Sequence, residues 1–108
     1  MSANLKKNWC FIQLLTSTTV QQKLALLKTL TDDQVLVLCE IVLNILQGQL
    51  YVPADTVRRL KKHKTFLRSL TSKAVSNRRK KDRIIARHKL VVQLIQIVKP
   101  LLETYMKE

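Results

Sequence analysis

The spacing of apolar positions along the chain predicts five helices and no sheet. In five stretches apolar residues recur every three or four positions, the period of a helix with one buried face. The β-branched run at 91–98 also fits a strand, but no neighbouring segment offers it a partner, so we expect helix there too. The predicted helices cover residues 5–15, 20–30, 32–47, 54–70 and 77–99.

Residues that favour helix ends stand at the boundaries of these segments. Gly48 suits the C-terminus of the third helix, because glycine readily adopts the left-handed conformation that often follows a helix. We expect Pro100 to end the fifth helix, because proline lacks the amide N–H and clashes with the preceding turn. Hydroxyl residues occupy the N-cap positions, two of them with a glutamine three residues later: Thr19 with Gln22, Thr31 with Gln34, and Ser76.

The chain is long enough for one folded domain. It has 108 residues, of which 46% are apolar. The third predicted helix is apolar on most of its circumference, so we expect it at the centre of the core. We therefore predict a single compact all-α domain over 1–108. It divides into a neutral helical base at 1–57, a basic helix-turn-helix-like segment at 58–89 and an apolar C-terminal helix at 90–108.

The positive charge is confined to this basic segment. The chain has 20 Lys and Arg against 7 Asp and Glu, which gives a formal net charge of +13. Residues 58–89 contain fourteen of the basic residues and one acid, Asp82, so they carry the whole excess. Apolar residues at helical spacing (Val57, Leu60, Leu67 and Leu70) indicate that the segment docks on the core rather than forming a loose tail. Such a charge density opposes folding and favours a polyanionic partner.

The sequence contains no catalytic or metal-binding constellation. A single glycine excludes glycine-rich phosphate loops. The carboxylates are scattered, apart from Asp32 and Asp33, which suit a helix N-terminus. The four residues that could bind zinc lack the short spacing of zinc sites: Cys10, Cys39, His63 and His88. We therefore predict a non-enzymatic protein with no catalytic residue, metal, cofactor or small-molecule substrate.

The cysteines and histidines are expected to be structural. Both cysteines lie in apolar surroundings, which predicts buried thiols in a reducing compartment. Both histidines fall on or beside apolar helix faces, which predicts packed or half-packed rings. For His63, a phosphate contact beside Lys62 and Lys64 is the alternative.

We expect the basic segment to bind duplex DNA with little sequence preference. Proteins that bind single strands interleave exposed aromatic and basic residues, whereas Phe66 is the only aromatic residue in this segment. No helix carries the group of Asn, Gln and Arg residues that reads bases, so phosphate contacts should dominate. The predicted contact residues are Arg58, Arg59, Lys61, Lys62, Lys64, Arg68, Lys73, Arg78, Arg79, Lys80, Lys81, Arg83 and Arg87.

The C-terminal helix suggests self-association. One side of this helix continues the apolar stripe of the preceding residues and is assigned to the core. Leu90, Leu94 and Ile97 point elsewhere and, if exposed, would form an apolar patch suited to a homodimer interface. The alternative is that the first helix, through Trp9 and Ile12, covers them.

Short motifs follow one another between residues 20 and 85: Ala25-Leu26-Leu27-Lys28-Thr29, Cys39-Glu40, Leu43-Asn44-Ile45-Leu46-Gln47-Gly48, Leu60-Lys61-Lys62-His63-Lys64, Leu67-Arg68-Ser69-Leu70, Ser72-Lys73, Val75-Ser76 and Arg78-Arg79-Lys80-Lys81. In order and spacing they resemble the small basic core-type proteins of Maverick/Polinton elements and adintoviruses, which are compared with the mu-like core protein of adenoviruses. The resemblance implies a genome-associated protein of a double-stranded DNA virus or virus-like transposon, located in the virion and the host nucleus. Members of that family end in a glycine-rich apolar tail, whereas residues 86–108 contain no glycine. The resemblance therefore implies no role for this end of the chain.

Three functions are compatible with these features. The leading hypothesis is a DNA-binding and DNA-condensing protein. The alternative is a helical adaptor whose basic face binds an acidic viral or host protein. A third, membrane-surface binding through residues 90–106 beside the basic segment, is the least favoured, and we expect no membrane partner.

Overall fold

Helices account for most of the chain in the computed structural model, which describes residues 2–107. The described residues contain no strand, so the all-α prediction is confirmed and residues 91–98 are helical. In chain order the helices are α1 (Ser2–Lys7), α2 (Trp9–Ser17), α3 (Val20–Lys28), α4 (Asp32–Leu46), α5 (Ala54–Lys61), α6 (Lys64–Thr71), α7 (Asn77–Ala86) and α8 (His88–Lys107).

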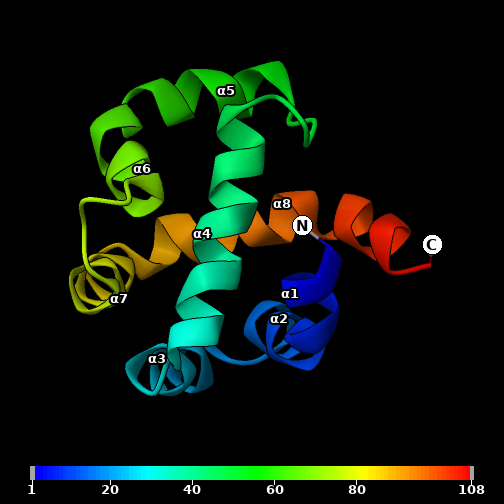
Figure 1. The fold of residues 1–108 in the computed structure, drawn as a ribbon. Helices are drawn as coiled ribbons and strands as arrows, with labels where there is room; N and C mark the ends of the chain where they lie inside the picture. Colours follow the sequence, from blue (N-terminus) through cyan, green and yellow to red (C-terminus); the bar gives the residue numbers. More distant parts are fainter. Residues whose placement is uncertain (1, 108) are drawn as a thin grey trace.

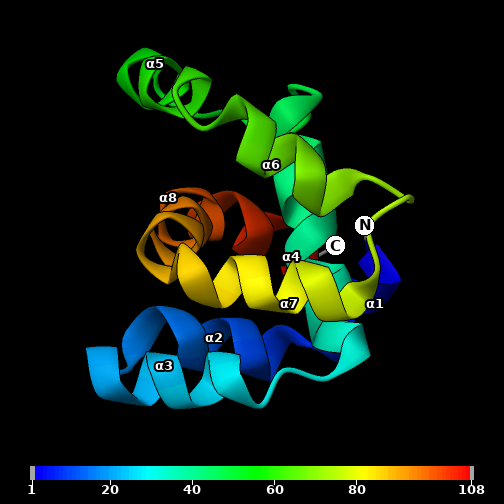
Figure 2. The ribbon, with the colours of Figure 1, turned by 90° about the vertical axis from the view of Figure 1, so that its left-hand side faces the viewer.

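Helix α4 stands at the centre of the molecule, as its apolar circumference predicts (Figure 1). It contacts α1, α6 and α7, and eight of its fifteen residues are buried. Helix α8 crosses it, with α5 on one side and α2 on the other, an order that Figures 1 and 2 both show. One core cluster takes side chains from all eight helices. The radius of gyration, 12.9 Å, matches the ~13 Å of a compact domain of this size.

Eight helices replace the predicted five because three of the predicted helices bend and divide. The backbone leaves the helical region at Asn8 (φ −109°, ψ 17°), His63 (φ −113°, ψ 18°) and Arg87 (φ −123°, ψ 39°). The two halves then contact different sets of neighbours. Helix α7 contacts α3 and α4, for example, whereas α8 contacts α1 and α2. Periodicity alone does not reveal these bends, because the apolar spacing continues through them.

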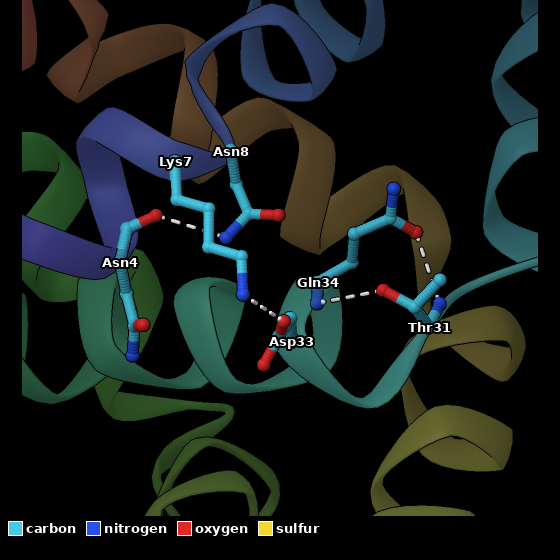
Figure 3. A network of polar contacts seen from close by, with 6 residues as sticks. All are labelled: Asn4, Lys7, Asn8, Thr31, Asp33 and Gln34. Carbon is cyan, nitrogen blue, oxygen red and sulfur yellow. Dashed lines mark hydrogen bonds and ion pairs between the residues drawn. The ribbon is translucent and has the colours of Figure 1, made fainter.

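The bend at Asn8 is supported by polar contacts, which Figure 3 shows together with the start of α4. The Asn8 side-chain amide donates to the Asn4 carbonyl oxygen at 2.9 Å. Asparagine side chains compete for backbone groups in this way, which weakens a helix interior. Lys7, the last residue of α1, pairs with Asp33 of α4 at 2.6 Å. The Asn8 side-chain bond lies beside the backbone bond to the same oxygen, and the Lys7–Asp33 pair connects α1 to the N-terminus of α4.

Pro100 does not end the last helix, contrary to the prediction. Helix α8 continues to Lys107 with Pro100 inside it. An interior proline removes a hydrogen bond and strains the preceding turn, at a cost of about 3 kcal/mol. Beyond it, Leu102 is fully buried, and Leu101 and Met106 pack against the core. Burial of these side chains offsets the cost of the proline.

The predicted N-caps are confirmed. The hydroxyl oxygens of Thr19 and Thr31 each accept the backbone N–H three residues later, and the glutamine at that position accepts the threonine N–H in return. Figure 3 shows the second of these capping boxes. Ser76 caps α7 by accepting the backbone N–H of Arg79. These local signals therefore set where α3, α4 and α7 begin.

Gly48 follows the end of α4, as predicted, and has a positive φ of 75°. The N–H groups of Gly48 and Gln49 donate to the carbonyl oxygens of Ile45 and Asn44, the hydrogen-bond pattern of a Schellman motif. The following residues turn back, so that Leu50 and Val52 are buried in the core.

Replacing Gly48 with alanine is expected to lower the free energy of unfolding by about 1 kcal/mol. A Cβ at this position would meet nothing within 4 Å, so the loss arises from the positive φ and not from a clash. Asparagine tolerates this conformation better, so Gly48→Asn should cost less. Urea denaturation of both variants measures the difference, and equal losses would contradict this explanation.

Candidate nucleic-acid interface

The basic segment follows one side of the molecule. Helices α6 and α7 lie on the side that faces the viewer in Figure 2, and α5 continues from α6 along the top. Ser72 follows the end of α6, and residues 72–76 form the turn that leads into α7. The cations are therefore held on three successive short helices and the turns next to them instead of on a loose tail.

The apolar faces of these helices decide which cations are exposed. Leu60 of α5, Leu67 and Leu70 of α6, and Ile84 of α7 are buried in the core. The prediction of a docked amphipathic segment is confirmed at these positions. Val57 is an exception: it is 40% exposed, and Thr56 takes the buried position in its place. Ten of the thirteen predicted contact residues are exposed: Arg58, Arg59, Lys61, Lys62, Lys64, Arg68, Lys73, Arg78, Arg79 and Arg87.

Lys80 is the main exception among the predicted contact residues. Only 8% of it is exposed, because it lies one helical turn before Ile84 on the face of α7 that enters the core. Helix α7 packs on α4 there, and the charge of Lys80 acts on the Cys39 thiol. Lys81 and Arg83, on the flanks of that face, are half-buried. Burial therefore disfavours Lys80 as a phosphate contact. Lys89, which the prediction omitted, is exposed.

The two cysteines differ in exposure, although both were predicted to be buried. Cys39 is buried in α4, whereas Cys10 is exposed on α2. Phe11, Ile12 and Leu15 form the buried face of α2, which turns Cys10 towards solvent. Burial raises the pKa of the Cys39 thiol to about 11, an effect that the charge of Lys80 reduces only in part.

Thiol labelling should distinguish the two cysteines. In the folded protein at neutral pH we expect Cys10 to react with iodoacetamide and Cys39 to stay unmodified, because only the thiolate is nucleophilic. In denaturant both should react. Mass spectrometry of the labelled chain identifies the modified residue, and rapid native labelling of Cys39 would be incompatible with the packing of α4.

Arg87 is held in place by two contacts at the bends. Its guanidinium donates to Nδ1 of His63 at 2.9 Å and lies over the Phe66 ring, 5.2 Å from the centroid. Arginine cannot accept a hydrogen bond, so Nδ1 of His63 is the acceptor. His63 is half-buried, in agreement with the predicted packing. Its phosphate contact stays a prediction. The sequence offers no sign of this cluster, because Arg87 lies more than 20 residues along the chain from the other two members.

The rest of the segment shows little charge compensation. Arg58 pairs with Asp55 one turn earlier, and both side chains are mostly exposed. Exposed ion pairs of this kind are weak and are screened by salt. Arg78 and Arg79 lie in the first turn of α7, where the helix macrodipole disfavours positive charge. A bound phosphate would relieve this repulsion.

The apolar patch predicted for self-association is not exposed. Leu94 is only 2% exposed, and Leu90 and Ile97 are half-buried. Helix α8 lies between α5 and α2 (Figure 2), so it is buried on more than one face. Leu94 belongs to this wider buried surface. Leu90, Leu94 and Ile97 line a hollow with residues of α5, so the alternative cover by Trp9 and Ile12 is also wrong. Homodimer formation stays a prediction, which sedimentation of the unmodified protein tests.

The described residues include neither a candidate metal site nor a candidate membrane span. Within residues 2–107, no group of three or more His, Cys, Asp and Glu side chains is placed to hold a metal ion. In the same part of the chain, no helix is both long enough and apolar enough to cross a membrane.

Comparison with known proteins identifies no relative. No protein-family model, no curated protein and no solved structure matches this chain.

Proposed function

We propose that this protein binds and condenses duplex DNA without enzymatic activity and with little sequence preference. The observation that supports this most strongly is the exposure of ten Lys and Arg side chains on α5–α7 and the adjoining turns. These helices lie on one side of a molecule whose net charge of +13 comes entirely from residues 58–89. Lysine and arginine neutralise phosphates and release the counterions condensed on DNA.

Docking on the core gives these cations an advantage over a flexible tail. Leu60, Leu67 and Leu70 fix α5 and α6 against the core, so their backbone is ordered before DNA binds. Less conformational entropy is then lost on binding. Residues 1–57, which have no net charge, provide the support and add little charge repulsion of their own.

The resemblance of residues 20–85 to core-type proteins extends this proposal to a biological setting. In that setting the DNA is the genome of a double-stranded DNA virus or virus-like transposon, and the protein acts in the virion and the host nucleus. The resemblance does not include residues 86–108, so the proposed viral or transposon setting assigns no role to them.

A salt series with duplex DNA tests the proposal. The logarithm of the association constant should fall linearly with the logarithm of salt concentration. Each neutralised phosphate contributes a slope of about −0.9, so six contacts would give roughly −5. Single-stranded DNA, RNA and anionic vesicles at matched salt are the comparison ligands. A flat salt dependence, stronger binding to the vesicles, or a preference above about 10³-fold for one DNA sequence would contradict sequence-tolerant DNA binding.

A further inference from the structure

A hollow with a volume of about 230 Å³ lies between α5 and α8. Its apolar wall includes the buried side chains of Leu60 and Leu94 and the half-buried side chains of Leu90 and Ile97. Two exposed cations, Arg59 of α5 and Lys62 directly after it, line the same hollow. The site therefore combines an apolar interior with a cationic edge.

The size of the hollow suits one bulky apolar group. A cavity of about 150 Å³ is enough for a benzene ring. Pockets that enclose drug-sized ligands begin at about 300 Å³. A single phenylalanine or leucine side chain from a partner therefore fits this volume better than a whole small-molecule ligand.

The charge around the hollow selects among possible occupants. Arg59 and Lys62 also line a second, more open hollow beside Arg58 and Asp55, so the cationic surface continues outwards along α5. A second copy of this chain offers no excess of carboxylates to pair with Arg59 and Lys62, because its residues outside 58–89 have no net charge and 58–89 are strongly basic. Duplex DNA matches the charge but keeps its bases stacked inside and has no side chain to insert. An acidic peptide with an apolar residue matches both features.

We propose that this hollow is a docking site for an acidic peptide segment of a partner protein. The peptide inserts one large apolar side chain between α5 and α8, against Leu90, Leu94 and Ile97. Its neighbouring carboxylates pair with Arg59 and Lys62. The proposal goes beyond DNA binding and does not rest on it, because the anchor contacts are apolar.

Two matched peptides test the docking site. One is a short fluorescent polyglutamate with a central phenylalanine, and the other has alanine in that position. Fluorescence anisotropy should show the phenylalanine peptide binding about tenfold or more tightly, because burial of a large apolar side chain favours binding by at least that factor. Both peptides should bind more weakly to the Arg59→Gln, Lys62→Gln variant, because both rely on the cationic edge.

A variant that fills the hollow localises the effect. Gln93 lines the hollow and is exposed, so Gln93→Trp should occupy the site without disturbing the core. This variant should lose the preference for phenylalanine over alanine. Gln21→Trp, at an exposed position on α3, is the matched control and should retain it. Circular dichroism checks that both variants are folded.

Four results would overturn the proposal. Equal affinity of the unmodified protein for both peptides would mean that charge alone drives binding. A preference that survives Gln93→Trp would place the anchor elsewhere. Dimerisation that Gln93→Trp abolishes would identify a second copy as the occupant, and stronger binding of oleate than of the phenylalanine peptide would identify a lipid. None of these titrations contains nucleic acid. A negative result would therefore overturn the docking site and leave the DNA-binding proposal unaffected.

Discussion

Simultaneous replacement of Arg58, Lys61, Lys62 and Arg68 with glutamine is expected to weaken duplex DNA binding on the order of 10²–10³-fold at about 0.1 M salt. All four side chains are exposed on α5 and α6 or at the bend between them. If each contacts one phosphate, the salt slope should become shallower by about 3 to 4. The melting temperature should stay the same or rise, because the change removes like charges from a strongly basic chain.

Two sets of controls make this result specific to the exposed basic side. Lys6→Gln with Lys28→Gln removes two exposed cations outside the segment and should have little effect on DNA binding. Lys80→Met removes a cation inside the segment that is buried, so DNA affinity should also change little. Anisotropy titrations of all variants with the same duplex provide the comparison. Unchanged affinity in the fourfold variant would show that these cations of α5 and α6 are exposed to solvent without contacting DNA.

The largest effect on stability is expected from Leu67→Ala, at about 2–5 kcal/mol. Leu67 is fully buried where α6 packs on α4, so its truncation removes buried apolar surface and leaves a cavity. Domains of this size are stable by only about 5–15 kcal/mol, so this loss is a large fraction of the total. Urea denaturation monitored by circular dichroism measures it.

Thr65→Ala is the matched control, because Thr65 is exposed on the same short helix. A surface change of this kind should alter the free energy of unfolding by no more than about 0.5 kcal/mol. If Leu67→Ala were equally mild, the basic segment would not be docked on the core. Its backbone would then not be ordered before DNA binds, and the proposed saving of conformational entropy would be lost.

Local signals in the sequence were enough to predict the helix ends that depend on neighbouring residues. The capping boxes at Thr19 and Thr31, the N-cap Ser76 and the left-handed Gly48 all have the predicted roles. Each involves groups only a few residues apart, so little else in the fold can change the outcome. The central place of α4 was equally predictable, because a helix that is apolar on most of its circumference is most stable with most of that circumference in the core.

The candidate interface was predictable in its location and less so in its individual residues. The concentration of Lys and Arg within 58–89 identified the segment, and the apolar spacing showed that it docks. Whether one lysine faces solvent or the core depends on the rotation of its helix against its neighbours. Lys80 is buried for this reason, and Cys10 is exposed for the same reason on α2.

The sequence by itself determined the all-helical class, the local helix ends and the location of the positive charge, because periodicity, capping and net charge involve only nearby residues or simple counts. The tertiary structure decided the bends at Asn8, His63 and Arg87, the continuation of α8 through Pro100 and the burial of Leu94. These features depend on packing between distant segments. Burial of Leu102 beyond Pro100 offsets a local penalty, and α5 and α2 on opposite sides of α8 widen its buried arc. The hollow between α5 and α8 has the same origin, since neither helix forms it alone.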